Sequence, residues 1–329
     1  MITQMTITNR PYAGEADLQP VCDLLNLCDS VDHLEEGFMT AESMRVWMDD
    51  PEVEPERDVH LWLDRDGRLV GYARTWIPKD PVEGEQDSHL FFRVHPDTRN
   101  QGIEEAIFEW GTGRVRPIGQ ERGLPAHMRT GLHYSTPEYI AYREDVLDRN
   151  GFRPVRYGYK MARPLNEPIP EPQFPEGITV RPAGGEAEAE KWTEMFNQTF
   201  IDHWNHTDWT VESYINWLKR PHYRQDIDLL AVAPDGTFAG FCVCFIDVDD
   251  NRANKRSEGW IDILGTRRGF RKIGLGKALL LQGMKVLKAE GIEVAVLGVD
   301  AENPTGALGL YESVGFYPVM KTGTYRKDL

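Results

Sequence analysis

Apolar residues recur along this chain with two different periods, and the change between them separates predicted strands from predicted helices. A run at 260–265 that is apolar except for Asp262 predicts a buried strand. Its period of two would place Trp260, Asp262 and Leu264 on one face, and Ile261, Ile263 and Gly265 on the other. Further on, apolar residues recur every three or four positions over 280–287, which predicts a helix. We expect this helix to begin near Lys277 and to stop at Gly291, because glycine often follows the last helical turn. The pattern therefore predicts a strand, a glycine turn and a helix, in that order.

The rest of the pattern predicts strands mixed with helices, which indicates an α/β protein. Asp-Gly turns at 65–67 and 234–236 separate pairs of β-rich runs, as is typical of hairpins. The predicted strands are 59–63, 69–77, 88–94, 228–233, 240–248 and 293–299. The predicted helices are 186–200, 211–219 with Thr210 as its N-cap, and a last helix that follows Asn303 as its N-cap, has Pro304 in its first turn and ends at Gly315.

Three short sequence patterns recur in a similar form, in the same order. The pairs are ITNRP at 7–11 with ITVRP at 178–182, RNQGIE at 99–104 with RKIGLG at 271–276, and GFRPV at 151–155 with GFYPV at 315–319. Two copies of one domain explain three ordered matches best.

A proline-rich segment lies between the two copies. Five prolines within 163–177 favour an extended connection and exclude a helix. We therefore predict an N-terminal domain at 1–165, a linker at 166–176 and a C-terminal domain at 177–329.

The glycine loop before the 280–287 helix has the residues of an anion site. Gly274 and Gly276 lack side chains that would keep a ligand from the backbone, so N–H groups at the helix start can point at phosphate. Lys272 and Lys277 add positive charge, as does Arg271.

Spacing excludes one common phosphate loop and disfavours another. A Walker loop would need glycine at Arg271 and Ser or Thr at Ala278, and a dinucleotide fingerprint would need glycine at Leu279. The pattern Arg-x-x-Gly-x-Gly remains, and an ordinary strand-to-helix turn stays open as an alternative.

The first copy of the loop differs at one decisive position. Glu104 stands where the second copy has Gly276, and its charge would repel phosphate oxygens. We expect the first copy not to bind the phosphate ligand, and 99–104 to be a simple turn.

Composition narrows the function further. The 329 residues suffice for two domains, and a formal charge of −16 argues against nucleic acid as a partner. The N-terminus has no apolar signal core, and no run approaches the roughly 18 to 20 apolar residues that span a bilayer. We therefore expect a cytoplasmic protein that does not enter the membrane. The four cysteines form no Cys-x-x-Cys pair and are expected to be buried and reduced.

Two residues are candidates for proton transfer. Asp262 interrupts an apolar strand, where a carboxylate is costly unless it faces a cleft or has a partner. It could deprotonate an amine, or it could simply pair with an arginine. Tyr311 has an ordinary pKa near that of a thiol and could donate a proton to a leaving thiolate, although Ala307 and Val314 mark a core-facing stripe beside it.

The segment 200–209 is rich in aromatic and polar residues, which suits the wall of a ligand pocket or an aromatic cluster beneath a loop. We predict acceptor contacts for Asp202, His203 and Trp204, and for Trp260 on the apolar strand. No metal site is predicted, because His203 and His206 have no third ligand nearby in the sequence.

Two motifs together carry a resemblance to a known family. The loop Arg271-x-x-Gly-x-Gly and the later Asn303-x₃-Ala-x₂-Leu-Tyr311-x₃-Gly315-Phe resemble the coenzyme A loop and the C-terminal motif of the GNAT superfamily of N-acetyltransferases. The whole chain resembles tandem GNAT proteins of the mycothiol synthase type. This implies two tandem GNAT domains, each with a mixed, mostly antiparallel sheet flanked by helices.

The resemblance also implies the cofactor site. In the family, the strand before the loop splays from its neighbour and pairs with the pantetheine of acetyl-CoA, while the loop binds the pyrophosphate. The residues implied to bind the cofactor are Ile263, Leu264, Gly265, Thr266, Arg271, Lys272, Ile273, Gly274, Leu275, Gly276, Lys277 and Asn303. Tyr311 matches a frequent acid for the thiolate.

The chain departs from the family at the base. Many relatives carry a glutamate where Trp260 stands, and others carry the acid where Asp262 stands. The first copy has Leu147 at the Tyr311 position, and Ser88 and Leu90 at the two base positions, which predicts an inactive domain.

Together these features predict an acetyl-CoA-dependent N-acetyltransferase that acts on a small primary amine. The C-terminal domain is expected to be active, and the protein to be a monomer or homodimer. The alternatives are a non-catalytic acyl-CoA sensor or scaffold, and an aminoacyl transferase, although the latter enzymes lack an intact coenzyme A loop.

Overall fold

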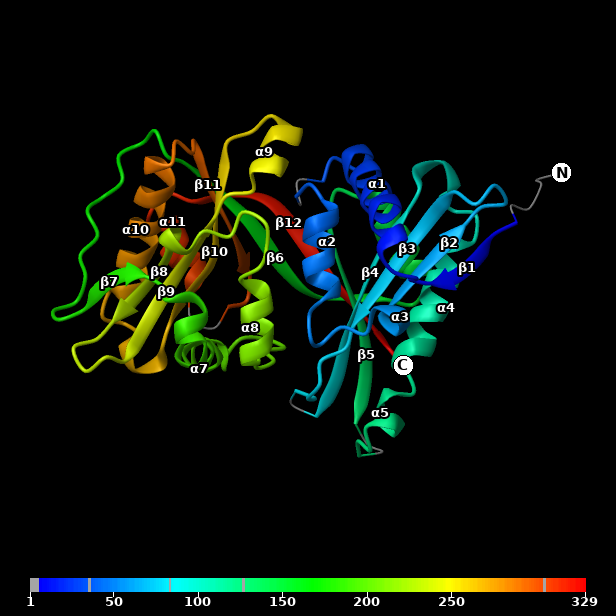
Figure 1. The fold of residues 1–329 in the computed structure, drawn as a ribbon, viewed down its shortest axis with the longest axis horizontal. Coiled ribbons are helices and arrows are strands. Elements are labelled where there is room, and N and C mark those ends of the chain that lie inside the picture. Colours follow the sequence, from blue (N-terminus) through cyan, green and yellow to red (C-terminus); the bar gives the residue numbers. More distant parts are fainter. Residues whose placement is uncertain (1–5, 35–36, 83, 126–127, 304–305) are drawn as a thin grey trace. The chain divides into compact units, whose positions relative to one another are not determined.

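The computed structural model describes residues 6–34, 37–82, 84–125, 128–303 and 306–329 (Figure 1). The chain folds into two compact units. Unit 1 comprises Met1–Arg156 and Thr322–Leu329, and unit 2 comprises Tyr157–Lys321.

Unit 1 is a mixed sheet with helices on both faces. Its strands are β1 (Thr8–Pro11), β2 (Val59–Leu63), β3 (Leu69–Trp76), β4 (Glu85–Val94), β5 (Arg129–Pro137) and the end of β12 (Tyr317–Asp328), in that spatial order. All neighbours are antiparallel except β4 and β5. Its helices are α1 (Glu15–Val31), α2 (Ala41–Met48), α3 (Pro55–Asp58), η1 (Pro96–Thr98), α4 (Ile103–Val115), α5 (Ile118–Glu121) and α6 (Ala141–Arg149).

Unit 2 repeats this plan. Its strands lie in the order β6 (Arg153–Pro164), β11 (Val294–Asp300), β10 (Glu258–Thr266), β9 (Phe238–Phe245), β8 (Asp228–Val232) and β7 (Thr179–Pro182), and only β10 and β11 are parallel. Its helices are η2 (Gly185–Glu188), α7 (Ala189–Phe200), α8 (Val211–Trp217), η3 (Gln225–Ile227), α9 (Val248–Asn254), η4 (Arg268–Phe270), α10 (Leu275–Ala289) and α11 (Ala307–Glu312). The predicted fold class is confirmed.

Successive side chains of β9 pack in two separate hydrophobic cores of unit 2. Phe241 and Val243 pack with the aromatic residues of α7 and α8, whereas Cys242 and Cys244 pack with α10. The sheet is therefore covered on both faces, which explains why its strands are almost continuously apolar.

The two halves of the sequence exchange their last strands. β6 ends the first half, yet it pairs with β11 in unit 2. β12 ends the second half, and its residues 322–328 pair with β5 in unit 1 (Figure 1). The compact units therefore differ from the predicted halves 1–165 and 177–329 by this exchange, and the proline-rich segment 166–176 lies within unit 2.

The last helix begins later than predicted. α11 starts at Ala307, directly after Gly306, which adopts a positive φ of 76° as the N-cap. The prediction that Asn303 caps this helix was wrong, because the chain turns there and the Gly306 N–H bonds back to the Asn303 carbonyl. Pro304 lies outside the described residues.

The predicted alternation along β10 was also wrong. The register with β9 shifts between Ile261 and Ile263, so Asp262 occupies a β-bulge. As a result Ile261 packs with the α10 core and Ile263 with the α7 core, although the sequence placed both on one face. One extra residue in a strand reverses the side on which every later side chain lies.

Within the described ranges, none of the helices combines the length and apolar character that crossing a membrane requires.

Candidate active site

β10 leaves β11 part-way along its length. The two strands pair only from Glu258 to Trp260, whereas pairing with β9 continues to Thr266. Beyond Trp260, the edge of β10 that faces away from β9 is therefore no longer paired with β11. This is the splay that the resemblance implied for 263–266.

The glycine loop delivers backbone N–H groups to the start of α10. Gly274 is the N-cap with a φ of 89°, and Lys272 also has a positive φ of 62°. Gly276 lies in the first turn, where an added Cβ would sit 3.2 Å from Thr266 Oγ1. The loop is thus held close to the end of β10, with the positive end of the helix dipole beside the open edge.

Most loop side chains lie in solvent. Lys272, Ile273 and Lys277 are exposed, whereas Leu275 is buried in the core, so only its backbone can meet a ligand.

Arg271 holds the loop from within. Its Nε donates to the Thr266 carbonyl at 3.1 Å, and its two terminal nitrogens donate to the Thr199 carbonyl and the Asp202 carboxylate, each at 2.7 Å. Asp202 also accepts from Arg268, and these two arginines hold the pKa of its carboxyl well below the usual range. The Asp202 carboxylate, for which we predicted an acceptor contact, is thus paired with two arginines of the glycine loop region.

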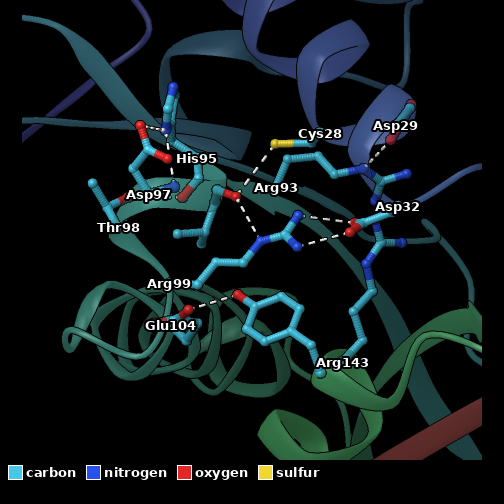
Figure 2. Close-up of polar contacts among 12 residues, drawn as sticks. Cys28, Asp29, Asp32, Arg93, His95, Asp97, Thr98, Arg99, Glu104 and Arg143 are labelled. Atoms are coloured by element: carbon cyan, nitrogen blue, oxygen red, sulfur yellow. Dashed lines mark hydrogen bonds and ion pairs between the residues drawn. The ribbon is translucent and has the colours of Figure 1, made fainter.

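Unit 1 has the same type of loop, but a side chain of the protein itself occupies it (Figure 2). Arg99 donates to the Val94 carbonyl at 3.3 Å and to Asp32 at 2.7 and 3.0 Å. The fully buried Glu104 occupies the position equivalent to Gly276, and its Oε1 accepts from the Asn100 N–H at 2.8 Å.

The Glu104 carboxylate has a second partner. The hydroxyl of Tyr142 donates to the same Oε1 at 2.6 Å, so a side chain of unit 1 already occupies the anion position of its own loop.

Tyr311 lies on α11 with 8% of its surface exposed. Burial raises the pKa of its hydroxyl to about 12, and no described residue offers that hydroxyl a hydrogen-bond partner. Its counterpart Leu147 is wholly buried in the core of unit 1.

Asp262 lies on the bulge and faces an arginine. Arg220 donates to Asp262 Oδ2 at 3.0 Å, and both side chains are about one-quarter exposed, at 27% and 28%. The Arg220 guanidinium lies 4.0 Å from the ring centre of Trp217 and 4.8 Å from that of Phe245. Among the described residues, Asp262 Oδ1 has no partner.

Comparison with known proteins decides the family. The sequence model of the acetyltransferase (GNAT) family matches residues 189–316. A mycothiol acetyltransferase of Salinispora arenicola is 31% identical over 76% of this chain and 75% of its own, and one of Salinispora tropica is 29% identical over 95% and 93%. The chain belongs to the GNAT family. It is therefore an acetyltransferase that acts on an amine, with acetyl-CoA as co-substrate.

Solved structures share the tandem GNAT fold. A GCN5-related N-acetyltransferase from Sphaerobacter thermophilus covers 98% of this chain and 95% of its own with a TM-score of 0.70 at 24% identity. A tandem GNAT protein from the clavulanic acid biosynthesis pathway covers 98% of both chains with a TM-score of 0.69 at 16% identity.

The GNAT sheet also carries a buried acid that the sequence analysis missed. Asp228 begins β8 opposite Val243, which in turn lies opposite Ile263, so it shares a face with the residue after the bulge. It is wholly buried, accepts from the Tyr223 hydroxyl at 2.9 Å, and burial raises its pKa to about 7. Its only sequence signal was a charge at the start of an apolar run.

The other residues for which we predicted contacts with the acceptor amine are His203, Trp204 and Trp260, and each has a neighbour within the protein. His203 is exposed, and its Nδ1 lies 3.2 Å from the Trp204 carbonyl. Trp260 lies on β10, with Lys160 Nζ 5.3 Å from its ring centre. In the described ranges, no group of three or more His, Cys, Asp or Glu side chains is arranged to hold a metal.

Proposed function

We propose that unit 2 is the catalytic unit of an acetyl-CoA-dependent N-acetyltransferase for a small-molecule primary amine, and that unit 1 is structural. One contrast carries this proposal. The first helical turn after the unit 2 loop has a bare glycine at Gly276, whereas Glu104 binds the loop amide in unit 1.

Acetyl-CoA would bind along unit 2 in two stretches. The open edge of β10 at 263–266 would pair with the pantetheine amides, and the N–H groups of 273–277 would bind the pyrophosphate. Lys272 and Lys277 would add long-range attraction, and Asn303 would lie near the cofactor. Arg271 would act as a positioning residue because its donors are already bonded to Thr266, Asp202 and Thr199.

The chemistry requires one proton acceptor and one proton donor. The amine nitrogen attacks the thioester carbon, an N–C bond forms and the C–S bond breaks. The proton leaving nitrogen goes to Asp262 directly or through water, and Tyr311 protonates the departing sulfur. The raised pKa of Tyr311 keeps its hydroxyl protonated at neutral pH, as an acid must be.

Two observations support a small acceptor. The relatives are named for acetylation of mycothiol, a small molecule. In addition, the Arg220 guanidinium, which pairs with Asp262, lies over the rings of Trp217 and Phe245, and a charged pair beside aromatic rings suits a polar ligand of modest size.

Calorimetric titration with acetyl-CoA tests the location of the site, and we expect one site per chain. A panel of primary amines, followed by detection of free coenzyme A thiol, tests the reaction. Two sites per chain would contradict a structural unit 1. Binding without turnover of any amine would favour an acyl-CoA sensor.

A further inference from the structure

Unit 1 has a guanidinium held between two aromatic rings. The Arg74 guanidinium on β3 lies 4.1 Å from the ring centre of Trp47 on α2 and 4.8 Å from that of Phe91 on β4. Arg74 and Phe91 are direct cross-strand partners. All three residues are partly exposed.

The charge of Arg74 is not neutralised by any carboxylate in the described residues. By contrast, the five arginines of unit 1 whose side chains are at most 15% exposed each pair with an aspartate: Arg93 with Asp29, Arg99 with Asp32, Arg114 with Asp58, Arg143 with Asp32 and Arg326 with Asp87. A desolvated cation without a counter-charge is costly, and a bound anion would remove that cost. Burial accordingly lowers the pKa of Arg74.

The surface continues along the same face. Trp76 and His89 form the next cross-strand pair with ring centres 5.4 Å apart, and both are partly exposed. Burial and nearby His133 lower the pKa of His89 to about 4, so His89 is neutral at pH 7. The Arg93 guanidinium also lies 4.3 Å from the Phe91 ring centre, but it is paired with Asp29. Arg74 therefore supplies the unpaired positive charge of this row, and the aromatic rings supply its apolar part.

The position of this row in the fold favours a ligand. Phe91 lies on the part of β4 beyond His89, where pairing with β5 has ended. Phe91 corresponds to Ile263 of unit 2, because each lies three residues before the end of its strand. At that end Val94 pairs with Gly71 in unit 1, and Thr266 pairs with Gly240 in unit 2. Arg74 thus occupies in unit 1 the position that Val243 occupies beside the predicted thioester region of unit 2.

We propose that Trp47, Arg74, Trp76, His89 and Phe91 form a binding site for a small oxyanion, a carboxylate or a phosphate, attached to a flat apolar group. Guanidinium matches the two oxygens of such anions, and the rings stack on the flat group. Unit 1 would then have a ligand of its own, distinct from acetyl-CoA, because Glu104 fills its phosphate loop.

The probes are benzoate and phenyl phosphate, with neutral benzamide as the uncharged control. Titration of the full chain, followed by calorimetry and tryptophan fluorescence, should show saturable binding of the two anions and at least tenfold weaker binding of benzamide. Preference for benzoate would identify a carboxylate ligand, and preference for phenyl phosphate would identify a phosphate ligand. Equal binding of benzamide would overturn the proposal, because the charge would then play no part.

Three variants locate the site. Arg74→Gln should weaken anion binding at least tenfold, and Arg74→Lys should weaken it less because the charge remains. The matched control is Arg181→Gln, whose guanidinium also lies over an aromatic ring, that of Phe238, but already has Glu188 as a carboxylate partner. Gly276→Glu excludes the anion site of unit 2.

The two control variants should bind the probes as the natural chain does. Binding that survives Arg74→Gln, or that is lost in Gly276→Glu, would overturn the proposal. If Arg74→Gln does not fold, Arg74→Lys and the Phe91→Leu variant provide the same test, since each should weaken the anions.

Discussion

Arg271 donates a hydrogen bond to Asp202 across 2.7 Å, and Arg99 makes the same contact with Asp32 across 2.7 Å in unit 1. Both arginines also donate to the last carbonyl of the preceding strand. An arginine–aspartate pair therefore stabilises the loop in both units, and the presence of this pair does not mark an active site. Only the residue in the first helical turn distinguishes an open loop from a filled one.

From the contact between Arg271 and Asp202 we predict that acetyl-CoA affinity depends on the geometry of the loop. Asp202→Asn removes the carboxylate that fixes Arg271 and Arg268, so we expect acetyl-CoA to bind about tenfold more weakly, or about 1.4 kcal/mol. Calorimetry measures this. Asp32→Asn is the matched control: it should lower the melting temperature, because two buried arginines lose their partner, and leave acetyl-CoA affinity unchanged. An affinity loss in Asp32→Asn would assign the site to unit 1.

Gly276→Glu transfers the unit 1 substitution to unit 2. A carboxylate among the loop amides should repel the pyrophosphate and weaken acetyl-CoA binding by orders of magnitude. Gly276→Ala separates size from charge, since its Cβ would meet Thr266 Oγ1 at 3.2 Å and add no charge. We expect a small effect from alanine and a large one from glutamate, and equal affinities for the two variants would reject an electrostatic origin.

Tyr311→Phe removes only the hydroxyl from a buried ring. If this hydroxyl protonates the thiolate, kcat should fall by roughly 10²-fold or more, with little change in the melting temperature. Tyr317→Phe is the control, because Tyr317 is 50% exposed on β12 and should behave as the natural chain does. A normal kcat for Tyr311→Phe, with chemistry as the slow step, would reduce this residue to a core side chain.

Asp262→Asn tests the base against the structural role of the Arg220 pair. Asparagine can still accept from Arg220, so the fold should survive. Loss of a base should depress kcat/KM most at low pH, where the amine is protonated, and leave acetyl-CoA affinity nearly intact. An unchanged pH–rate profile together with a lowered melting temperature would show that Asp262 only anchors Arg220.

From the raised pKa of buried Asp228 we predict that the free energy of unfolding depends on pH. Burial raises its pKa from 3.8 in the unfolded chain to about 7, so between these values the folded state holds a proton that the unfolded state has lost. Stability should therefore fall with rising pH over this window, by about 1.4 kcal/mol per pH unit, and level off above pH 7. Asp228→Asn should flatten this slope and be more stable than the natural chain at pH 8. Urea unfolding from pH 5 to pH 8 measures both, and parallel curves for the two proteins would contradict the prediction.

The sequence alone determined the features that depend on short-range spacing. The strand at 260–265, the loop at 271–276 and the helix after it follow from hydrophobic period and glycine placement, which act over a few residues. The double occurrence of the loop likewise identified Glu104 as the difference between the halves, because comparison at one aligned position needs no structure.

The tertiary structure decided what depends on distant partners. Arg271 contacts Asp202 and Thr199, which lie 69 and 72 residues away, so the sequence could not show that its charge was already used. The bulge at Asp262 arises from the register with β9, and register is a property of two strands together.

The exchange of β6 and β12 has the same origin. Both strands end a copy of the same domain and carry a Pro-Val pair near their start, so this local pattern does not tell which sheet each strand completes. The pairing with β11 or β5 decides it. The surroundings of Arg74 and Asp228 also depend on the tertiary structure. The sequence of a strand does not show whether a counter-charge faces one of its charged residues, because that depends on which helices cover the sheet.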